Sequence, residues 1–165
     1  SVYKSGESFM KTAVYAGTFD PITNGHVDIA QRAASLFNKV IVAVAKENYK
    51  NNMFSLDERC ALAREALADI KNIEVVEFDG LLVDFCHQQG ADAIIRGLRA
   101  VSDFDAEFQM ALLNRKLNGG MDTVFLMSDA KYQFISSSII RNCAGLGAEI
   151  TDMVPACVAE ALKRR

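Results

Sequence analysis

The pattern that decides the fold of this chain lies in residues 14–45, VYAGTFDPITNGHVDIAQRAASLFNKVIVAVA. An apolar strand is predicted from Val14 to Gly17, and apolar residues at helical spacing follow it over 27–37. Residues 40–45 are β-branched and apolar on both faces, which is typical of a strand covered on both sides. Two such strands joined through one helix indicate a parallel pair with a crossover connection.

The same alternation of strand and helix continues to the end of the chain. Further strands are predicted over 73–78, 93–95 and 123–127. Further helices are predicted from the capping box Ser55-Leu56-Asp57-Glu58 to near Asp69, over 81–89 up to Gly90, from a Ser102 cap to Gly119-Gly120, and from Ser136 or Ser137 and from Pro155. The Ser102 helix has one stripe with a three-four repeat, made of Phe104, Phe108, Ala111, Leu112 and Arg115. The sequence therefore predicts a single α/β domain over residues 10–165, with a doubly wound, five-stranded parallel sheet of the Rossmann-like kind.

Length and composition agree with one compact domain. Half of the 165 residues are hydrophobic, and a chain of this size buries roughly 68 to 70% of its unfolded surface. Disorder, collagen and coiled coil are excluded. No apolar run approaches the about 20 residues that span a bilayer, so we expect no membrane association and place the protein in the cytoplasm. The net charge of −3 argues against general nucleic-acid binding.

The chain offers few groups for a metal or a covalent intermediate. Its four cysteines are widely separated, with no CxxC pair, and we expect reduced thiols that pack like small apolar residues. His26 and His87 are its only histidines, and we expect His87 to be structural or solvated. Residues 1–9 are polar and unpatterned and precede Met10, so we expect them to be an added leader rather than part of the domain.

The exit of the first strand reads Gly17-Thr18-Phe19-Asp20-Pro21-Ile22-Thr23-Asn24-Gly25-His26. Doubly wound sheets bind ligands beyond the carboxyl ends of their strands. Thr23 can cap the following helix, and Gly25 leaves its exposed amides clear for an anion, to which His26 can add a hydrogen bond. The alternative is an ordinary turn with a satisfied surface histidine. The convergence of glycines, hydroxyls and His26 favours an anion site.

At this point the sequence resembles the nucleotidyltransferases with a (His or Thr)-x-Gly-His signature, here Thr23-Asn24-Gly25-His26. Arg96-Gly97-Leu98-Arg99 after the fourth strand and Ile135-Ser136-Ser137-Ser138 after the fifth extend the match from Met10 to the C-terminus. Together they resemble the bacterial phosphopantetheine adenylyltransferases. The resemblance implies that the protein joins ATP to 4′-phosphopantetheine, giving dephospho-coenzyme A and pyrophosphate.

The resemblance also implies roles for particular residues. His26, Lys50 and Arg99 would be catalytic. The 4′-phosphopantetheine site would include Thr18, Lys50, Leu82 and Arg96. The ATP site would include Thr18, Phe19, His26, Gly97, Leu98, Arg99, Glu107, Tyr132, Gln133, Phe134, Ile135, Ser136, Ser137 and Ser138. Two positions depart from the commonest pattern of the family, since Ala16 and Ser128 stand where many members have proline.

Several of these residues have a plainer alternative from the sequence alone. Arg96 and Arg99, whose spacing suits a tight loop better than one strand face, could each pair with Asp103 or Asp105. The remaining alternatives are a solvated loop lysine for Lys50, a core side chain for Leu82 and a solvated helix charge for Glu107.

No serine or cysteine stands in a recognisable arrangement with a histidine and a carboxylate, so we expect direct attack by the substrate phosphate. Mg²⁺ is expected on the phosphate oxygens, mostly with water as its other ligands and with no protein ligand named. The family implies a homohexamer and makes coenzyme A a candidate feedback ligand.

Three rival functions stay open from the sequence. The nearest is a sister nucleotidyltransferase for another substrate, and the second is a nucleotide-binding regulatory module of the flavodoxin type. A Rossmann dehydrogenase fits poorly, because Gly145-Leu146-Gly147 lacks the third glycine, with Ile150 in its place, and does not open the first helix.

Overall fold

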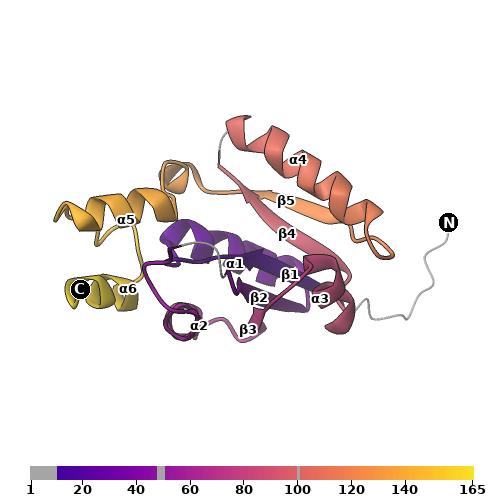
Figure 1. Ribbon diagram of the computed structural model, residues 1–165, viewed down its shortest axis with the longest axis horizontal. Coiled ribbons are helices and arrows are strands. Elements are labelled where there is room, and N and C mark those ends of the chain that lie inside the picture. The colour runs from indigo at the N-terminus through magenta and orange to yellow at the C-terminus, as the bar shows by residue number, and fades with distance from the viewer. Residues whose placement is uncertain (1–10, 48–50, 100) are drawn as a thin grey trace.

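The computed structural model describes residues 11–47, 51–99 and 101–165, so the expected leader over residues 1–9 lies outside the described residues. The strands are β1 (Thr12–Gly17), β2 (Lys39–Ala45), β3 (Ile73–Phe78), β4 (Ala93–Leu98) and β5 (Thr123–Met127). The helices are α1 (Asn24–Leu36), α2 (Leu56–Ala66), α3 (Leu82–Gln88), α4 (Val101–Lys116), the short 3₁₀ helix η1 (Ala130–Tyr132), α5 (Ser137–Gly145) and α6 (Ala156–Lys163) (Figure 1).

The five strands form one parallel sheet in the order β3-β2-β1-β4-β5. The chain first moves outward from β1 to β3, and then returns to the other side of β1 with β4. This reversal confirms the predicted doubly wound fold. It also makes the carboxyl ends of β1 and β4 the point where the chain leaves the sheet in opposite directions, which is where such sheets open a crevice.

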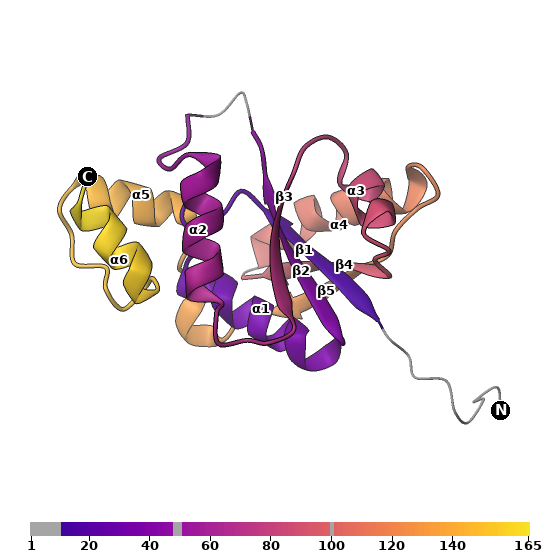
Figure 2. The same ribbon diagram turned by 90° about the horizontal axis from the view of Figure 1, so that it is seen from below.

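The two faces of the sheet are covered by different helices, with α1 and α2 on one side and α3 and α4 on the other (Figure 2). Alternate residues of each central strand enter the two layers, as the period of two in a strand requires. Val40 and Val42 pack in the layer under α1 and α2, whereas Ile41 and Ala43 pack in the layer under α3. Burial on both faces explains why β2 is apolar throughout.

The fourth strand is longer than predicted, and this corrects the assignment of Arg96, Gly97 and Leu98 to a tight loop. β4 pairs with β1 only as far as the Tyr15–Ile95 pair, but its pairing with β5 continues through Leu98. Residues 96–98 stay in the strand because they still form hydrogen bonds with β5 alone. The apolar run over 93–95 did not indicate this extension. The two central strands therefore separate after Tyr15 and Ile95, and the crevice opens between them.

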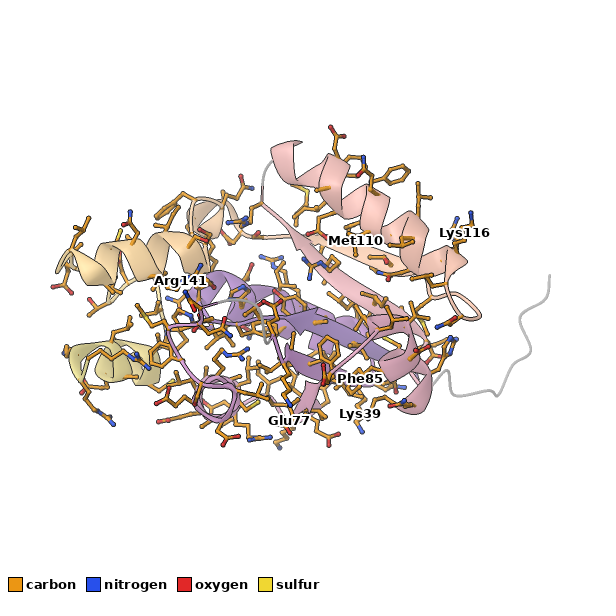
Figure 3. All side chains as sticks on the ribbon, viewed as in Figure 1. Lys39, Glu77, Phe85, Met110, Lys116 and Arg141 are labelled. Carbon is orange, nitrogen blue, oxygen red and sulfur yellow. The ribbon has the colours of Figure 1, made fainter. Side chains whose placement is uncertain are left out.

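Helix α4 exposes its apolar side chains instead of burying them. Phe104, Phe108, Met110, Leu112 and Leu113 are each 43 to 52% exposed, and Met110 is labelled on this helix in Figure 3. The predicted stripe through Phe104, Phe108 and Leu112 thus belongs to the outer surface of the chain. None of the helices in the described ranges is long and apolar enough to cross a membrane.

Candidate active site

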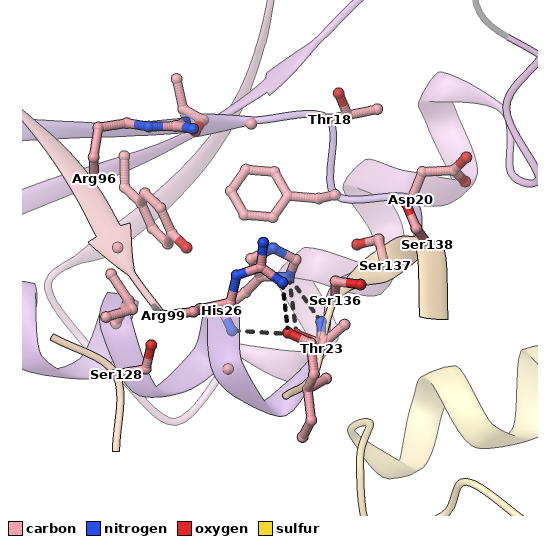
Figure 4. A pocket seen from close by; sticks show the side chains of 18 of the residues that line it. Thr18, Asp20, Thr23, His26, Arg96, Arg99, Ser128, Ser136, Ser137 and Ser138 are labelled. Atoms are coloured by element: carbon pink, nitrogen blue, oxygen red, sulfur yellow. Dashed lines mark hydrogen bonds between the residues drawn. The ribbon is translucent and has the colours of Figure 1, made fainter. Parts of the chain in front are cut away.

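A cavity of about 540 Å³ opens at the carboxyl ends of β1 and β4 (Figure 4). Segments from most of the chain meet there: the exit of β1 with the first turn of α1, Asn51 and Asn52 before α2, the end of β4, the middle of α4, Ser128 after β5, and the start of α5. Gly97 makes this meeting possible, because a side-chain carbon at this position would lie 2.9 Å from Ile29 of α1. The glycine therefore lets the first helix pack directly against β4.

His26 is held in one orientation by the start of its own helix. Its Nδ1 accepts a hydrogen bond from the Thr23 amide at 3.0 Å, while the Thr23 hydroxyl accepts from the His26 amide (Figure 4). Because Nδ1 is an acceptor, the proton of the neutral ring lies on Nε2. Removal from water, together with the charges of Arg99 and Arg96, lowers the pKa of His26 to about 4. At neutral pH the site therefore offers a neutral N–H donor.

Two aromatic side chains fix the ring of His26 further. The Phe19 ring meets it edge-on with centroids 5.0 Å apart, and the Tyr15 ring lies edge-on to Phe19 at 5.4 Å. Phe19 has φ of +49°, the left-handed region that non-glycine residues rarely adopt. Burial raises the pKa of Tyr15, so its phenol stays protonated beside the cavity.

Arg96 is tied to α4 by a two-point ion pair. Its Nε and Nη2 donate to the two carboxylate oxygens of Glu107 at 2.8 and 2.7 Å, and its Nη1 donates to the Ala16 carbonyl. The structure pairs Arg96 with Glu107, whereas the side chain of Asp103 lies outside the described residues, so the alternative of an ion pair with Asp103 or Asp105 stays a prediction. The guanidinium enters the cavity from the end of β4 with a carboxylate already bound to it.

Arg99, which directly follows β4, contacts the segment that leads into the serines of α5. Arg99 Nη1 donates to the Ile135 carbonyl at 3.2 Å, and Ser136 caps α5 by accepting from the Ile139 amide. Ser137 donates to the Pro21 carbonyl at 2.8 Å, which joins the start of α5 to the exit loop of β1. The first turn of α5 thus presents its amides beside those of α1, an arrangement that favours anions.

The cavity contains most of the site residues expected from the sequence. Its lining includes Thr18, Phe19, His26, Arg96, Gly97, Arg99, Glu107, Ile135, Ser136, Ser137 and Ser138. Leu82, Leu98, Tyr132, Gln133 and Phe134 are not part of the lining. Leu82 packs on the core under α3, and Tyr132 packs on the core under α1. Lys50 lies outside the described residues, so its role stays a prediction.

The cavity also has lining residues to which the sequence assigned no role. Arg141 of α5 donates to the Asp20 carbonyl at 2.8 Å, and Figure 3 shows it at this end of the sheet. Ser128 donates through both its amide and its hydroxyl to the Leu98 carbonyl. A proline at 128 could not donate the amide bond. Asp20 lies in the Gly17–His26 segment from which the sequence predicted an anion site, but the sequence does not indicate that its carboxylate accepts from the amides of Met53 and Phe54.

The carboxylates around the cavity are committed to other groups. Asp20 accepts from two backbone amides, Glu107 from Arg96, and Glu47 from the Thr18 hydroxyl at 2.9 Å. Within the described ranges, no three His, Cys, Asp or Glu side chains are grouped so that they could hold a metal ion. A divalent ion in this cavity would therefore depend on oxygens that a ligand brings with it.

Comparison with known proteins gives a consistent result. The family model described as cytidylyltransferase-like matches residues 14–143. The chain is 55% identical over 156 residues to the phosphopantetheine adenylyltransferase of Moorella thermoacetica, covering 94% of this chain and 98% of that protein. It is 51% identical to the enzyme of the same name from Desulfosudis oleivorans and 49% identical to that from Finegoldia magna, in both cases over 94% of this chain and more than nine-tenths of the relative.

Solved structures resemble the fold at lower sequence identity. A structure from Vibrio parahaemolyticus, assigned as a nicotinate-nucleotide adenylyltransferase, superposes with a TM-score of 0.64 at 18% identity, covering 92% of this chain and 97% of that one. A lipopolysaccharide core biosynthesis protein from Thermoplasma volcanium superposes with a TM-score of 0.55 at 22% identity, covering 73% of this chain and 98% of that one. At these identities the likeness concerns the fold alone.

Proposed function

The chain belongs to the phosphopantetheine adenylyltransferases, which transfer the adenylyl group of ATP to 4′-phosphopantetheine, and we propose that it does so by direct in-line attack. The products are dephospho-coenzyme A and pyrophosphate. One observation carries the proposed mechanism: a neutral His26 with its Nε2–H free to donate stands at the floor of a cavity rimmed by arginines and helix amides. The substrate phosphate is already an anion, so no protein nucleophile is needed.

In this mechanism the protein aligns two phosphate groups and offsets their repulsion. The Nε2–H of His26 donates to the α-phosphate as its geometry becomes pentacovalent, and Arg99 shares the charge of the outgoing pyrophosphate. Thr18, the Phe19 amide and the first turn of α5 hold the ATP phosphates. Alignment of two reactants can supply roughly 7 to 11 kcal/mol of the barrier. Donors fixed on the developing charge lower the barrier further.

Arg96 is the proposed anchor for the phosphate of 4′-phosphopantetheine. Its guanidinium lies at the end of β4 and can hold two phosphate oxygens at once. Lys50 and Leu82 are proposed to contact the same substrate, and Leu98, Tyr132, Gln133 and Phe134 the nucleotide, on the strength of the family motif. Glu107 is proposed near the nucleotide, where it also holds Arg96.

Mg²⁺ is proposed to reach the site on the phosphate oxygens of ATP. The donor set around the cavity fits this, because its carboxylates already accept from amides, a hydroxyl and Arg96. The ion would neutralise phosphate charge and keep water as its other ligands, since Mg²⁺ gives up water reluctantly. The reaction belongs to coenzyme A biosynthesis, and we propose that it takes place in the cytoplasm with coenzyme A as a feedback ligand.

The exposed face of α4 supports the proposal that the enzyme is a homohexamer. Phe104, Phe108 and Leu112 share one face of α4, and Met110 and Leu113 add exposed apolar area on other sides of the helix. Each of these side chains is 43 to 52% exposed, and monomers rarely expose this much apolar surface in one place. A second copy of the chain is the proposed cover for this face. Light scattering should give the mass of six chains, and the mass of one chain would contradict the proposal.

A pyrophosphate-release assay tests the activity. ATP with 4′-phosphopantetheine should release pyrophosphate, whereas ATP with nicotinamide mononucleotide and CTP with glycerol phosphate should not. A regulatory nucleotide-binding module would bind ATP yet fail to exchange labelled pyrophosphate into ATP when dephospho-coenzyme A is supplied. Release with one of the other substrate pairs alone would assign the chain to a sister activity.

A further inference from the structure

Behind the exit loop of β1, on the side away from the cavity, α2 places a buried arginine. Arg59 is 2% exposed and does not line the cavity. Its Nη1 donates to the carbonyls of Thr18 and Ala45, both at 2.8 Å, and its Nε donates to the carbonyl of Phe54 at 3.2 Å. A charge this deeply buried destabilises the folded protein unless its donors are satisfied. Arg59 therefore joins three segments that follow β1 and β2.

The bond from Arg59 to Thr18 decides which way the next amide points. The Thr18–Phe19 peptide is trans and planar, so its C=O and its N–H point in opposite directions. Arg59 holds the oxygen on the α2 side, and the Phe19 N–H consequently points toward the cavity side. The left-handed φ of Phe19, +49°, is a conformation that persists only where the surroundings hold it.

A second buried charge fixes the segment that Arg59 holds. Asp20 is 2% exposed, and its two carboxylate oxygens accept from the amides of Met53 and Phe54, both at 2.8 Å (Asp20 is labelled in Figure 4). Phe54 is thereby held at both ends of its backbone, through its N–H by Asp20 and through its C=O by Arg59. Its ring is also covered by Arg165, whose guanidinium lies 4.4 Å from the ring centre.

We propose that Arg59 is a positioning residue for adenylyl transfer, which holds the Thr18–Phe19 peptide so that its N–H donates to the reacting phosphates. The proposal rests on the proposed function. Arg59 touches neither substrate, and it acts through the backbone of the loop. An amide aimed in advance needs no reorientation as charge develops, which is the condition under which such donors lower a barrier. Loss of the bond should therefore reduce turnover more than binding.

The test compares two arginines of the same helix. Arg59→Lys keeps the charge but cannot hold three carbonyls from one planar group. Arg64→Lys is the matched control, because Arg64 also donates to a backbone carbonyl, that of Val75 at 3.3 Å, but is exposed. We expect Arg59→Lys to lower kcat about 10- to 100-fold and to leave the KM values for both substrates within about threefold of the wild type. This loss is smaller than the about 10²- to 10³-fold loss in kcat on deletion of an oxyanion donor, because the Phe19 amide is still present. Arg64→Lys should stay within about twofold.

A purely structural role is separated from positioning by measuring turnover per folded protein. Both variants are assayed well below their melting temperatures, with circular dichroism at the assay temperature. A folded Arg59→Lys enzyme with wild-type kcat overturns the proposal. If the wild type releases no pyrophosphate, the proposed function fails instead, which is a different outcome.

A measurement on the unaltered chain covers the case in which Arg59→Lys does not fold. Inorganic pyrophosphate is added to ¹⁵N-labelled wild-type protein, and the amide signal of Phe19 is followed. We expect this signal to shift on binding, and in a folded Arg59→Lys protein we expect the shift to be reduced while that of Gly25 is kept. A Phe19 amide that does not respond in the wild type overturns the proposal.

Discussion

The two sides of the cavity are built in different ways. On the β1 side, the groups are Thr18, Phe19, Thr23 and His26, and they are held by hydrogen bonds to backbone atoms or to their own helix start. On the β4 side, the main group is Arg96, which is held by the carboxylate of Glu107. The β1 side presents neutral donors at fixed positions, whereas the β4 side presents a full charge that already has an anionic partner.

We expect this difference to separate catalysis from binding. A fixed neutral donor such as His26 Nε2–H gains most when charge appears in the transition state. A full positive charge such as Arg96 attracts the substrate phosphate as soon as the substrate binds, so it acts on the ground-state complex first. We therefore expect changes on the β1 side to lower kcat, and changes on the β4 side to raise KM.

The largest effect is expected at His26. His26→Ala removes the N–H donor and should lower kcat about 10²- to 10³-fold, as is usual for a lost oxyanion donor. ATP binding should weaken less, because the contact strengthens as the reaction proceeds. Steady-state pyrophosphate release gives kcat, and calorimetry with a nonhydrolysable ATP analogue gives the dissociation constant.

The chain supplies its own control for this substitution. His87→Ala removes the other histidine, which is exposed on α3 and does not line the cavity, so its kinetic constants should match the wild type. Equal losses in ATP binding and in kcat for His26→Ala would mean that His26 acts in ground-state binding only. The two sides of the cavity would then not differ as proposed.

A smaller effect is expected at Arg96, and mainly on KM. Arg96→Gln removes the proposed two-point contact between the guanidinium and the substrate phosphate. Hydrogen bonds to charged groups contribute about 1.5 to 3 kcal/mol to binding. It also leaves Glu107 without its partner guanidinium beside the incoming anion. The KM for 4′-phosphopantetheine should rise about 10- to 100-fold, while kcat changes less. Initial rates at varied 4′-phosphopantetheine and saturating ATP provide both values.

Removing the carboxylate as well separates the two causes. In Arg96→Gln with Glu107→Gln, the lost attraction remains but the repulsion from Glu107 is gone, so part of the KM increase should be recovered. A double-mutant cycle over the four proteins measures the coupling between the two residues. If neither single change alters the KM for 4′-phosphopantetheine, Arg96 is not the anchor of that substrate.

The sequence predicted the fold, and it predicted the edge of the sheet at which the cavity lies, because both depend on local patterns. Apolar runs separated by helical patterns identified all five strands, and the segments after β1, β4 and β5 were expected to meet at one edge of the sheet. Thr23, His26 and Ser136 were found because helix starts have a short-range signature. Each of these features is confined to a few consecutive residues.

What the sequence could not predict depends on contacts between distant segments. Arg59 lies 41 positions from Thr18, and nothing near it in the chain distinguishes it from the exposed Arg64. The length of β4 was wrong because its last three residues are held by β5 alone. The exposure of the α4 stripe could not be predicted, because an apolar stripe has the same pattern whether it faces the core or the outer surface.

The smallest effect is expected when pH is varied. The pKa of His26 is lowered from 6.5 to about 4, chiefly by burial, so the folded protein keeps the ring neutral where an unfolded chain binds a proton. The unfolded state then binds more protons between about pH 4 and 6.5, and His26 makes stability fall as pH drops through that window. Above pH 6.5 the contribution of His26 to the free energy of unfolding is constant. Because the ring also stays neutral between pH 6 and 8, its titration should change kcat/KM less than about twofold over that range.

The substrate also titrates in the pH range over which kcat/KM is measured, but its titration can be distinguished from that of His26. The second pKa of a phosphate monoester is about 6, so ionisation of 4′-phosphopantetheine can bend the profile by itself. A bend that persists in His26→Gln belongs to the substrate, and the carbon-bound ring protons of His26, followed by NMR in the free enzyme, report the residue directly. They should titrate near pH 4. A midpoint near 6.5 would mean that a charged imidazole is available at the floor of the cavity, and the contrast between a neutral β1 side and a charged β4 side would be lost.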